Sequence, residues 1–342
     1  MRVLDSFPHP APPAPRGRIL PLFLPFAGCP QRCIFCDQQA QTGQPPEPPE
    51  AALDRLAALL AAPGPPAELA FYGGTFTSLP GRLAERLLDA AAPHKACGRL
   101  TAIRCSTRPD ALEPGRLADL KRRGLDTVEL GVQSFADAAL AASRRGYAGA
   151  VAEAACALVR AAGLGLGVQL LPGLPGHTPA DFRRDIARAC ALAPNFVRLY
   201  PCLVLDGTPL AALWRAGRYA PWSLPDAVEA LAQALLTLWD ARVPAARIGL
   251  AEQDGLPVLA GPRHPALGQM ARARALFLRV RQRVARLSER AERPDTLLCP
   301  RRWQGEILGQ GNALAADYAA LGVAVAFADV AAFTLGIGGG DG

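Results

Sequence analysis

Three cysteines stand close together near the start of the chain, at Cys29, Cys33 and Cys36. Their spacing is C-x₃-C-x₂-C, and the aromatic residue Phe35 directly precedes the third. Cysteine thiolates are the protein ligands of iron–sulfur clusters, and a four-iron cluster takes four ligands. Because this loop supplies three, one iron would be left open to a ligand that is not protein. The loop is therefore a candidate site for redox chemistry at an iron–sulfur centre.

A structural zinc site is the main alternative for the three cysteines. Such a site needs a fourth Cys or His at a nearby paired spacing. His9 lies in a proline-rich segment and Cys97 is far along the chain. The spacing therefore favours a cluster over zinc, and a disulfide is a weaker interpretation still.

Two short motifs downstream carry groups that suit a small polar ligand. Gly73 and Gly74, followed by Thr75, let the backbone approach a ligand with no Cβ in the way. Ser106 and Arg108 place a hydroxyl and a guanidinium in one loop, which suits ribose hydroxyls and a carboxylate. The alternatives are an ordinary strand-to-loop turn at the glycines and a turn with surface charges at the second motif.

Two further motifs place polar side chains on apolar strands. Glu129 and Gln133 face the same way on the alternation of a strand, toward an otherwise apolar interior. A buried carboxylate needs a partner, for which Arg145 is the candidate, and a structural ion pair is an equally good interpretation. Gln169 lies on an apolar strand that leads into a Gly/Pro loop, which suits an adenine ring or a simple turn. His177 is interpreted as a loop residue rather than a catalyst.

The elements that must position these residues alternate between strand and helix. Strands are predicted at residues 19–26, 68–72, 100–105, 127–131, 166–171 and 196–200. Helices are predicted at 51–62, 82–92, 114–123, 136–143, 150–162 and 179–192. Such alternation predicts parallel βα units that roll into a full or partial barrel. The candidate motifs then follow the C-terminal ends of strands, where the functional loops of such barrels lie.

The pattern changes after residue 201 and becomes basic. Helices are predicted at 210–217, 224–242 and 266–290, with a last strand at 248–250. Residues 263–302 hold 11 arginines and three acids, whereas the whole chain has a net charge of +7, so the basic surplus is local. A basic stripe on the last helix comprises Arg272, Arg279, Arg283, Arg286 and Arg290. This stripe suits phosphate attraction, and a solvated or interdomain helix face is an equally good interpretation.

Length and composition set the expected organisation. The chain has 342 residues, of which half are hydrophobic, enough for a large α/β domain and a smaller appendage. We expect an irregular N-terminal arm (1–18), a barrel (19–205), a barrel extension (206–262) and a basic helical region (263–342). No signal peptide or apolar run of membrane-spanning length is visible, which favours a reducing cytoplasm for the nine cysteines.

The motifs resemble those of the radical S-adenosylmethionine superfamily, and in particular the radical domain of the Elongator catalytic-subunit family. The stretches that carry the resemblance are 29–36, 73–80, 106–110, 129–134, 145–147 and 199–219. It implies an α/β fold, a partial (β/α)₆ barrel of TIM type, with a mainly helical C-terminal extension. It also implies a [4Fe-4S] cluster on Cys29, Cys33 and Cys36 and S-adenosyl-L-methionine on the open iron. The cluster would cleave that molecule to a 5′-deoxyadenosyl radical, which abstracts hydrogen from a substrate.

The resemblance also assigns further residues and partners. The residues expected to contact S-adenosylmethionine are Phe35, Gly73, Gly74, Thr75, Ser106, Arg108, Glu129, Gln133, Arg145 and Gln169. A reductase of flavodoxin or ferredoxin type would donate the electron, tRNA or a nucleoside is the candidate substrate, and no membrane partner is expected. Ser106 departs from the Glu usual in Elongator relatives, and no acetyl-CoA-type loop is found, so acetyltransferase activity is not expected.

Two other functions stay open on the sequence. Radical enzymes for small molecules such as tetrapyrroles, including anaerobic coproporphyrinogen oxidase and its haem-binding relatives, share a Gly-Val-Gln-Ser stretch like residues 131–134. They carry a Tyr-rich lead into the cysteines, whereas residues 22–28 here read Leu-Phe-Leu-Pro-Phe-Ala-Gly. A non-enzymatic interaction protein with a bound metal is the third interpretation.

Overall fold

Seven parallel strands form the main sheet of the protein. The computed structural model describes residues 1–13, 17–43, 48, 50–250 and 255–338. It divides into two units, which we call the half-barrel unit and the terminal unit. The half-barrel unit comprises Ala14–Ser223 and Ala245–Arg263. The terminal unit comprises Met1–Pro13, Leu224–Pro244 and His264–Gly342.

The sheet of the half-barrel unit follows the order of its strands in the sequence. These are β2 (Ile19–Phe23), β3 (Ala67–Tyr72), β4 (Leu100–Thr107), β5 (Thr127–Gln133), β6 (Gly165–Leu170), β7 (Phe196–Leu199) and β9 (Ala245–Ile248). Every neighbouring pair is parallel. Because β2 and β9 are the two edge strands, the barrel is partial, which confirms the predicted fold class. The last strand lies slightly earlier than the expected 248–250.

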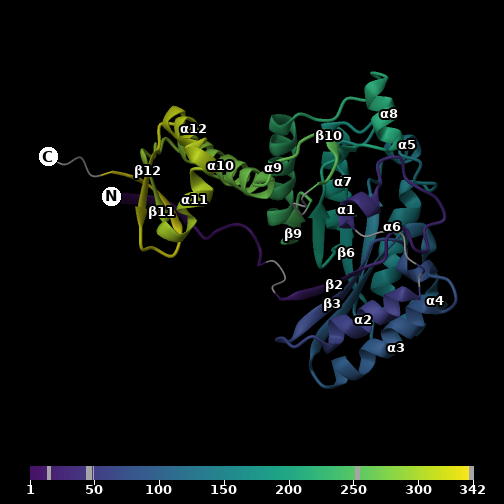
Figure 1. Ribbon diagram of the computed structural model, residues 1–342. Helices are drawn as coiled ribbons and strands as arrows, with labels where there is room; N and C mark the ends of the chain where they lie inside the picture. The colour runs from purple at the N-terminus through teal and green to yellow at the C-terminus, as the bar shows by residue number, and fades with distance from the viewer. Residues whose placement is uncertain (14–16, 44–47, 49, 251–254, 339–342) are drawn as a thin grey trace. The chain divides into compact units, whose positions relative to one another are not determined.

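Helices connect the strands and cover the outside of this sheet (Figure 1). They are α2 (Ala51–Ala61), α3 (Leu83–Ala96), α4 (Pro114–Arg122), α5 (Asp137–Ala142), α6 (Gly149–Ala161), α7 (Pro179–Ala191) and α8 (Pro209–Arg215). Helix α7 shows why such helices begin where they do. Thr178 and Asp181 form a reciprocal capping box, and Pro179 occupies the first turn, where its missing N–H costs nothing.

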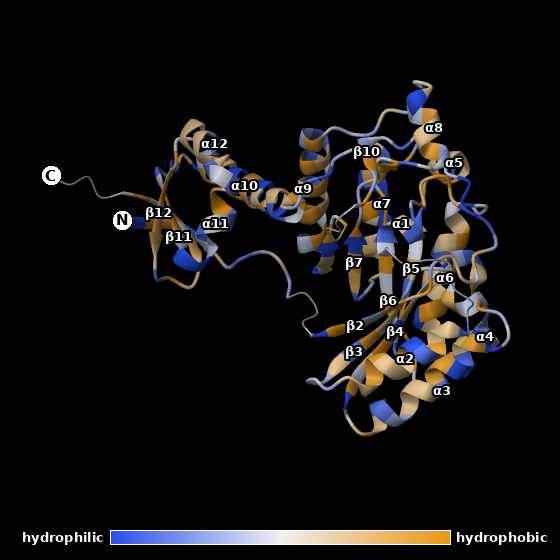
Figure 2. Cartoon of the chain, in the orientation of Figure 1, coloured by the Kyte–Doolittle hydropathy of each residue, from blue (hydrophilic) through white to orange (hydrophobic). Residues whose placement is uncertain are grey.

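The strands are apolar because helices cover one face of the sheet and the other face lines its interior. Figure 2 shows the hydrophobic colouring along β2, β3 and β4. Strands buried on both faces read as nearly continuous apolar runs. The buried polar exceptions on these strands, which include Arg104, Glu129 and Arg198, therefore need an explanation in terms of the site.

The terminal unit contains a second, four-stranded sheet. Its order is β1 (Arg2–Phe7), β13 (Phe333–Ile337), β11 (Thr296–Pro300) and β12 (Ala324–Ala328). Strand β13 pairs antiparallel with both β1 and β11, whereas β11 and β12 are parallel. The helices are α9 (Leu224–Asp240), α10 (Leu267–Ser288), α11 (Gln304–Ile307) and α12 (Ala315–Ala320).

The sequence predicted the long helices of this unit but not its sheet. The arm over residues 1–18 was expected to be irregular, and this was wrong for the strand β1, which the structure places at Arg2–Phe7; residues 14–16 lie outside the described residues. Two smaller features were also missed, the helix α1 (Gln38–Thr42) and the antiparallel pair of β8 (Val204–Leu205) with β10 (Val258–Ala260). The other domain boundaries drawn from the sequence stay predictions.

No helix among the described residues is both long enough and apolar enough to cross a bilayer.

Strand β1 gives the first testable prediction. Phe7 is 3% exposed, stacks on Phe333 at a centroid distance of 5.4 Å, and lies beneath the Arg283 guanidinium at 4.1 Å. We expect Phe7→Ala to lower the free energy of unfolding by about 3–5 kcal/mol, because a buried aromatic ring is replaced by a cavity. Urea denaturation followed by tryptophan fluorescence measures this, since Trp239 and Trp303 lie in the same unit.

The control for this prediction is Val3→Ala in the same strand. Val3 is 58% exposed, so its truncation should change the stability by no more than about 0.5 kcal/mol. Equal effects of the two substitutions would contradict the assignment of β1 to the core of the terminal unit.

Candidate functional site

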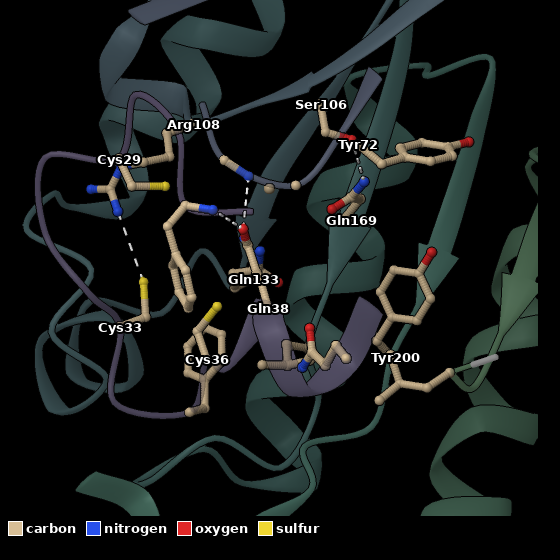
Figure 3. Close-up of a pocket in the computed structure, with 18 of the residues that line it drawn as sticks. Cys29, Cys33, Cys36, Gln38, Tyr72, Ser106, Arg108, Gln133, Gln169 and Tyr200 are labelled. Atoms are coloured by element: carbon tan, nitrogen blue, oxygen red, sulfur yellow. Dashed lines mark hydrogen bonds between the residues drawn. The ribbon is translucent and has the colours of Figure 1, made fainter. Parts of the chain in front are cut away.

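A pocket of about 350 Å³ lies at the C-terminal ends of the parallel strands. Its walls come from the cysteine loop after β2 and from the segments that end β3, β4, β5, β6, β7 and β9. Figure 3 shows the three cysteines on one side of the pocket and Tyr72, Gln169 and Tyr200 on the other. The topology thus gathers in one place residues that are more than 200 positions apart in the chain.

The three loop cysteines all line this pocket. Burial raises the pKa of the Cys29 thiol and raises that of Cys36 to about 12. Among the described residues, no three His, Cys, Asp or Glu side chains converge on a point where one metal ion would sit. A cubane cluster does not require such a point, because each thiolate binds a different iron. Three thiols that border a shared space therefore fit a cluster.

Two buried arginines carry positive charge to the second cysteine. Arg145 Nη1 lies 3.0 Å from Cys33 Sγ, and Arg108 Nη1 lies 3.8 Å from the same sulfur. Each of these arginine residues is 4% exposed. Arg108 is oriented by two hydrogen bonds to Asp110, of 2.9 and 2.7 Å. The two guanidinium groups thus supply positive charge at the point where a metal-bound thiolate would carry negative charge.

The Gly73–Gly74 segment packs against the cysteine loop. Both glycines have positive φ, +76° and +59°, and a Cβ on Gly74 would lie 2.2 Å from the Ala27 carbonyl oxygen. Glycine is therefore required at Gly74 by conformation and by space. Thr75 is fully buried and its hydroxyl lies 3.3 Å from Cys29 Sγ.

Gln38 joins these two segments, and the sequence analysis missed it. Its Oε1 accepts the backbone N–H of Phe26 at 2.6 Å and that of Gly74 at 2.9 Å. Both hydrogen bonds are drawn in Figure 3. The available signal was its position two residues after Cys36, where Asp37 caps the short helix α1. Gln38 thus fixes the distance between the cysteine loop and the glycines.

Glu129 lies beneath the pocket in a network of its own. It is fully buried and accepts hydrogen bonds from Arg104 Nη1 at 3.0 Å and from Arg198 Nε at 2.7 Å. Gln169 Nε2 donates to it at 3.0 Å. The sequence analysis proposed Arg145 as the partner of Glu129, and this prediction was wrong. The Arg145 side chain instead forms hydrogen bonds with Cys33, Tyr147 and the Gly131 carbonyl.

The space for Glu129 depends on a glycine in the neighbouring strand. Gly167 pairs with Glu129 between β5 and β6, and a Cβ there would lie 3.0 Å from Glu129 Cγ and 2.7 Å from the Phe196 ring. Arg198 Nη2 also donates to the Tyr72 hydroxyl at 2.9 Å. Burial raises the pKa of Tyr72, and the negative charge of Glu129 adds to this, so the phenol stays protonated.

The remaining predicted contact residues also border the pocket. Phe35, Ser106, Gln133 and Gln169 line it, and Gln169 Nε2 lies 3.3 Å from the Ser106 hydroxyl. Gln133 has a φ of +68°, a conformation that costs energy for a residue with a side chain. Its carbonyl oxygen accepts the Leu171 N–H at 2.7 Å, which ties the ends of β5 and β6 together. Such strain at a pocket wall is typical of functional positions.

His177 does not line the pocket. Its Nδ1 accepts the Gly173 N–H at 3.3 Å, and its Nε2 lies 3.0 Å from Asp185 Oδ2, outside hydrogen-bond geometry. Asp185 also accepts the Ser134 hydroxyl at 2.6 Å. The buried side chains of His177, Asp185 and Ser134 thus connect the loops after β5 and β6 outside the pocket. This placement agrees with the expectation that His177 is not a catalyst.

Two of the five arginines in the basic stripe on α10 form close ion pairs within the terminal unit. Arg279 pairs with Asp240 at 2.5 Å, and Arg283 pairs with Asp5 at 2.7 Å. Their side chains are partly buried, 12% and 24% exposed. These two arginines therefore serve the packing of the unit, which favours the interpretation of the stripe as an internal helix face.

Comparison with known protein families gives two matches. A model of the radical SAM superfamily matches residues 23–189, and a model of the radical SAM C-terminal domain matches residues 194–279. The first match covers the cysteine loop and β3 to β6, and the second begins just before β7.

Curated relatives match parts of the chain. The tRNA uridine(34) acetyltransferase of Methanocaldococcus infernus is 30% identical over 146 residues, which cover 41% of this chain and 27% of that protein. The enzyme of the same name from Dehalococcoides mccartyi is 29% identical, over 57% of this chain and 50% of that protein. Elongator complex protein 3 of Homo sapiens is 29% identical, over 65% and 44%. The chain thus matches half or less of the length of each.

Solved structures support the fold. An archaeal Methanocaldococcus infernus Elp3 with an N-terminal deletion aligns with a TM-score of 0.54 at 21% identity, over 81% of this chain and 63% of that one. Streptococcus suis SuiB bound to S-adenosylmethionine aligns with a TM-score of 0.50 at 11% identity, over 69% and 51%.

The Glu129 network gives the second testable prediction. Glu129→Gln removes the negative charge that faces Arg104 and Arg198, and it leaves two buried guanidinium groups under-compensated. We expect a loss of about 3 kcal/mol in the free energy of unfolding, measured by urea denaturation. The control is Glu113→Gln, because Glu113 is exposed and its side chain makes no capping hydrogen bond. A loss no larger than that of the control would contradict the central role of this carboxylate.

Proposed function

Since this chain belongs to the radical S-adenosylmethionine superfamily, a superfamily of enzymes, we propose that its pocket holds a [4Fe-4S] cluster and S-adenosylmethionine. The observation that carries the proposal is the placement of Cys29, Cys33 and Cys36 on one pocket that continues past them. When bound, the reduced cluster and S-adenosylmethionine supply a 5′-deoxyadenosyl radical that removes hydrogen from a substrate carbon. The tasks left to the protein are to bind, orient and shield.

The cysteine side of the pocket is suited to hold an anionic metal centre. Thiols must lose their protons to bind iron, and a bound metal drives this loss even where burial opposes it. Arg108 and Arg145 lie against Cys33 and supply positive charge at this point. Thr75 contacts Cys29, so a second sulfur also has a hydrogen-bonding neighbour.

The walls next to the cysteines are suited to bind S-adenosylmethionine. We propose that Gly73, Gly74 and Gln133 border its methionine end and that Ser106 and Gln169 contact its ribose. Phe35 and Leu171 offer apolar surface at the same pocket. Glu129 is fully buried, and we propose that it acts through Gln169 and Arg198, whose side chains it orients.

We propose a nucleoside of tRNA as the substrate. The support is the similarity to proteins named tRNA uridine(34) acetyltransferase. We do not extend to this chain the acetyl transfer that the names of these relatives state. We also propose an electron donor of flavodoxin or ferredoxin type. We propose a reducing cytoplasm as the location, since the cysteines of the described residues are free.

The third testable prediction concerns the cluster. Anaerobic reconstitution of the full chain with iron and sulfide should give a protein with the broad visible absorption of an iron–sulfur cluster. Cys33→Ser should lose most of the bound iron, because an alcohol replaces a thiolate ligand. The control is Cys97→Ser, since Cys97 is exposed and lies outside the pocket. Tight binding of zinc in place of the cluster, or full iron retention by Cys33→Ser, would contradict the proposal.

The fourth prediction concerns the substrate. The reconstituted protein, given dithionite and S-adenosylmethionine without oxygen, should form 5′-deoxyadenosine. Addition of tRNA should raise the rate, and nuclease digestion of that tRNA beforehand should abolish the increase. Chromatography with mass detection measures the product. Stimulation by a porphyrinogen with none by tRNA would overturn the substrate proposal and leave the radical chemistry intact.

A further inference from the structure

The charge of the pocket wall has a marked bias. Among the described residues, the pocket is lined by five arginines and by no aspartate or glutamate; the arginines are Arg32, Arg108, Arg145, Arg198 and Arg247. A concave surface of one sign concentrates ligands of the opposite charge. A substrate that enters beside the proposed cluster and S-adenosylmethionine should therefore carry negative charge.

The five arginines fall into two groups. Arg108, Arg145 and Arg198 are buried, between 4% and 7% exposed, and their guanidinium groups are bonded within the wall. Arg32 and Arg247 are exposed and form no ion pair with a described carboxylate. Arg32 lies over the Phe26 ring at 3.7 Å, and Arg247 Nε donates to the Gly249 carbonyl at 3.1 Å. Both guanidinium groups therefore carry charge that no carboxylate of the described residues neutralises.

These two exposed arginines come from opposite edges of the sheet. Arg32 is in the loop that follows β2, and Arg247 is in β9, and these are the first and last strands in the sheet order. A partial barrel is open between its edge strands. Arg32 and Arg247 also both line the pocket, so they border it from the two ends of the sheet order.

We propose that Arg32 and Arg247 bind backbone phosphates of an RNA whose target nucleoside enters the pocket. An enzyme that acts on a base within a polymer must take that nucleotide out of the stack, while the flanking backbone stays outside. Arg32 and Arg247 are exposed and line the pocket from different segments, so their guanidinium groups can bind the phosphates that flank this nucleotide. The inference deepens the proposed function and rests on its choice of RNA as the substrate.

The fifth prediction tests this with the full chain and an unmodified tRNA transcript, by filter binding over a series of salt concentrations. The logarithm of the association constant falls as the logarithm of the salt concentration rises. Each phosphate contact that is lost should make this slope less steep by about 0.7–0.9. We expect this decrease for Arg247→Ala and a weaker change for Arg247→Lys, which keeps the charge. Arg32→Ala should behave like Arg247→Ala, provided that its iron content after reconstitution equals that of the unaltered protein.

The matched control is Arg160→Ala. Arg160 is an exposed arginine of α6 in the same unit, it bonds a backbone carbonyl at 2.9 Å as Arg247 does, and it does not line the pocket. Its substitution should leave the slope unchanged. An equal decrease for Arg160→Ala would show diffuse attraction and overturn the inference.

Two outcomes separate this inference from the proposed function. Unchanged salt dependence in Arg247→Ala, with tRNA-stimulated 5′-deoxyadenosine formation by the unaltered protein, would overturn the phosphate contacts alone. Displacement of tRNA by uridine 5′-monophosphate at equal phosphate concentration would also overturn them, because it would identify a free nucleotide as the ligand. Absence of 5′-deoxyadenosine would instead count against the radical chemistry, whatever the binding results.

Discussion

One buried carboxylate organises the interior of the half-barrel. Glu129 on β5 is bonded by Arg104 from β4, Gln169 from β6 and Arg198 from β7, and Arg198 also reaches Tyr72 at the end of β3. Five neighbouring strands are therefore linked through a single ionised group. In an interior of low dielectric such a group is tolerated if its charge and its lone pairs are satisfied. The mutual position of these strand ends, and with it the pocket wall, depends on that balance.

The site built on this base has two functional sides held together by few contacts. The cysteine side is held to the sheet by Gln38, which bonds both Phe26 and Gly74, and by Arg145, which bonds both Cys33 and Gly131. The other side consists of side chains that Glu129 orients directly or through Arg198. A cluster bound to the cysteines would thus face a wall whose hydrogen-bond donors already have fixed orientations. This arrangement reduces the conformational entropy that the side chains lose when a ligand binds.

The half-barrel and the cysteine loop could be predicted from the sequence, because local patterns determine them. The cysteine spacing, the strand–helix alternation and the turn glycines are short-range features, and the structure reproduces the half-barrel that they indicate. The partners of Glu129 could not be predicted, because strand register is not a local property, and Arg145 was nearer in the sequence than Arg198. The sheet of the terminal unit was missed for the same reason: β1 pairs with a strand more than 300 residues later. Gln38 was missed because a lone glutamine carries no distinctive pattern.

The pairing of β1 with β13 also constrains how the chain can fold during synthesis. In the sheet order, β13 lies between β1 and β11, so β1 has no neighbour there until β13 has left the ribosome. The seven parallel strands, β2 to β7 and β9, are all made before β13, and neither β1 nor β13 belongs to their sheet. The nascent chain must therefore keep an unpaired edge-forming segment available until β13 has been made, a period in which such segments can pair wrongly. The polar pair Asp5 and Ser6 interrupts the apolar residues of that strand, which lowers its tendency to associate before β13 is made.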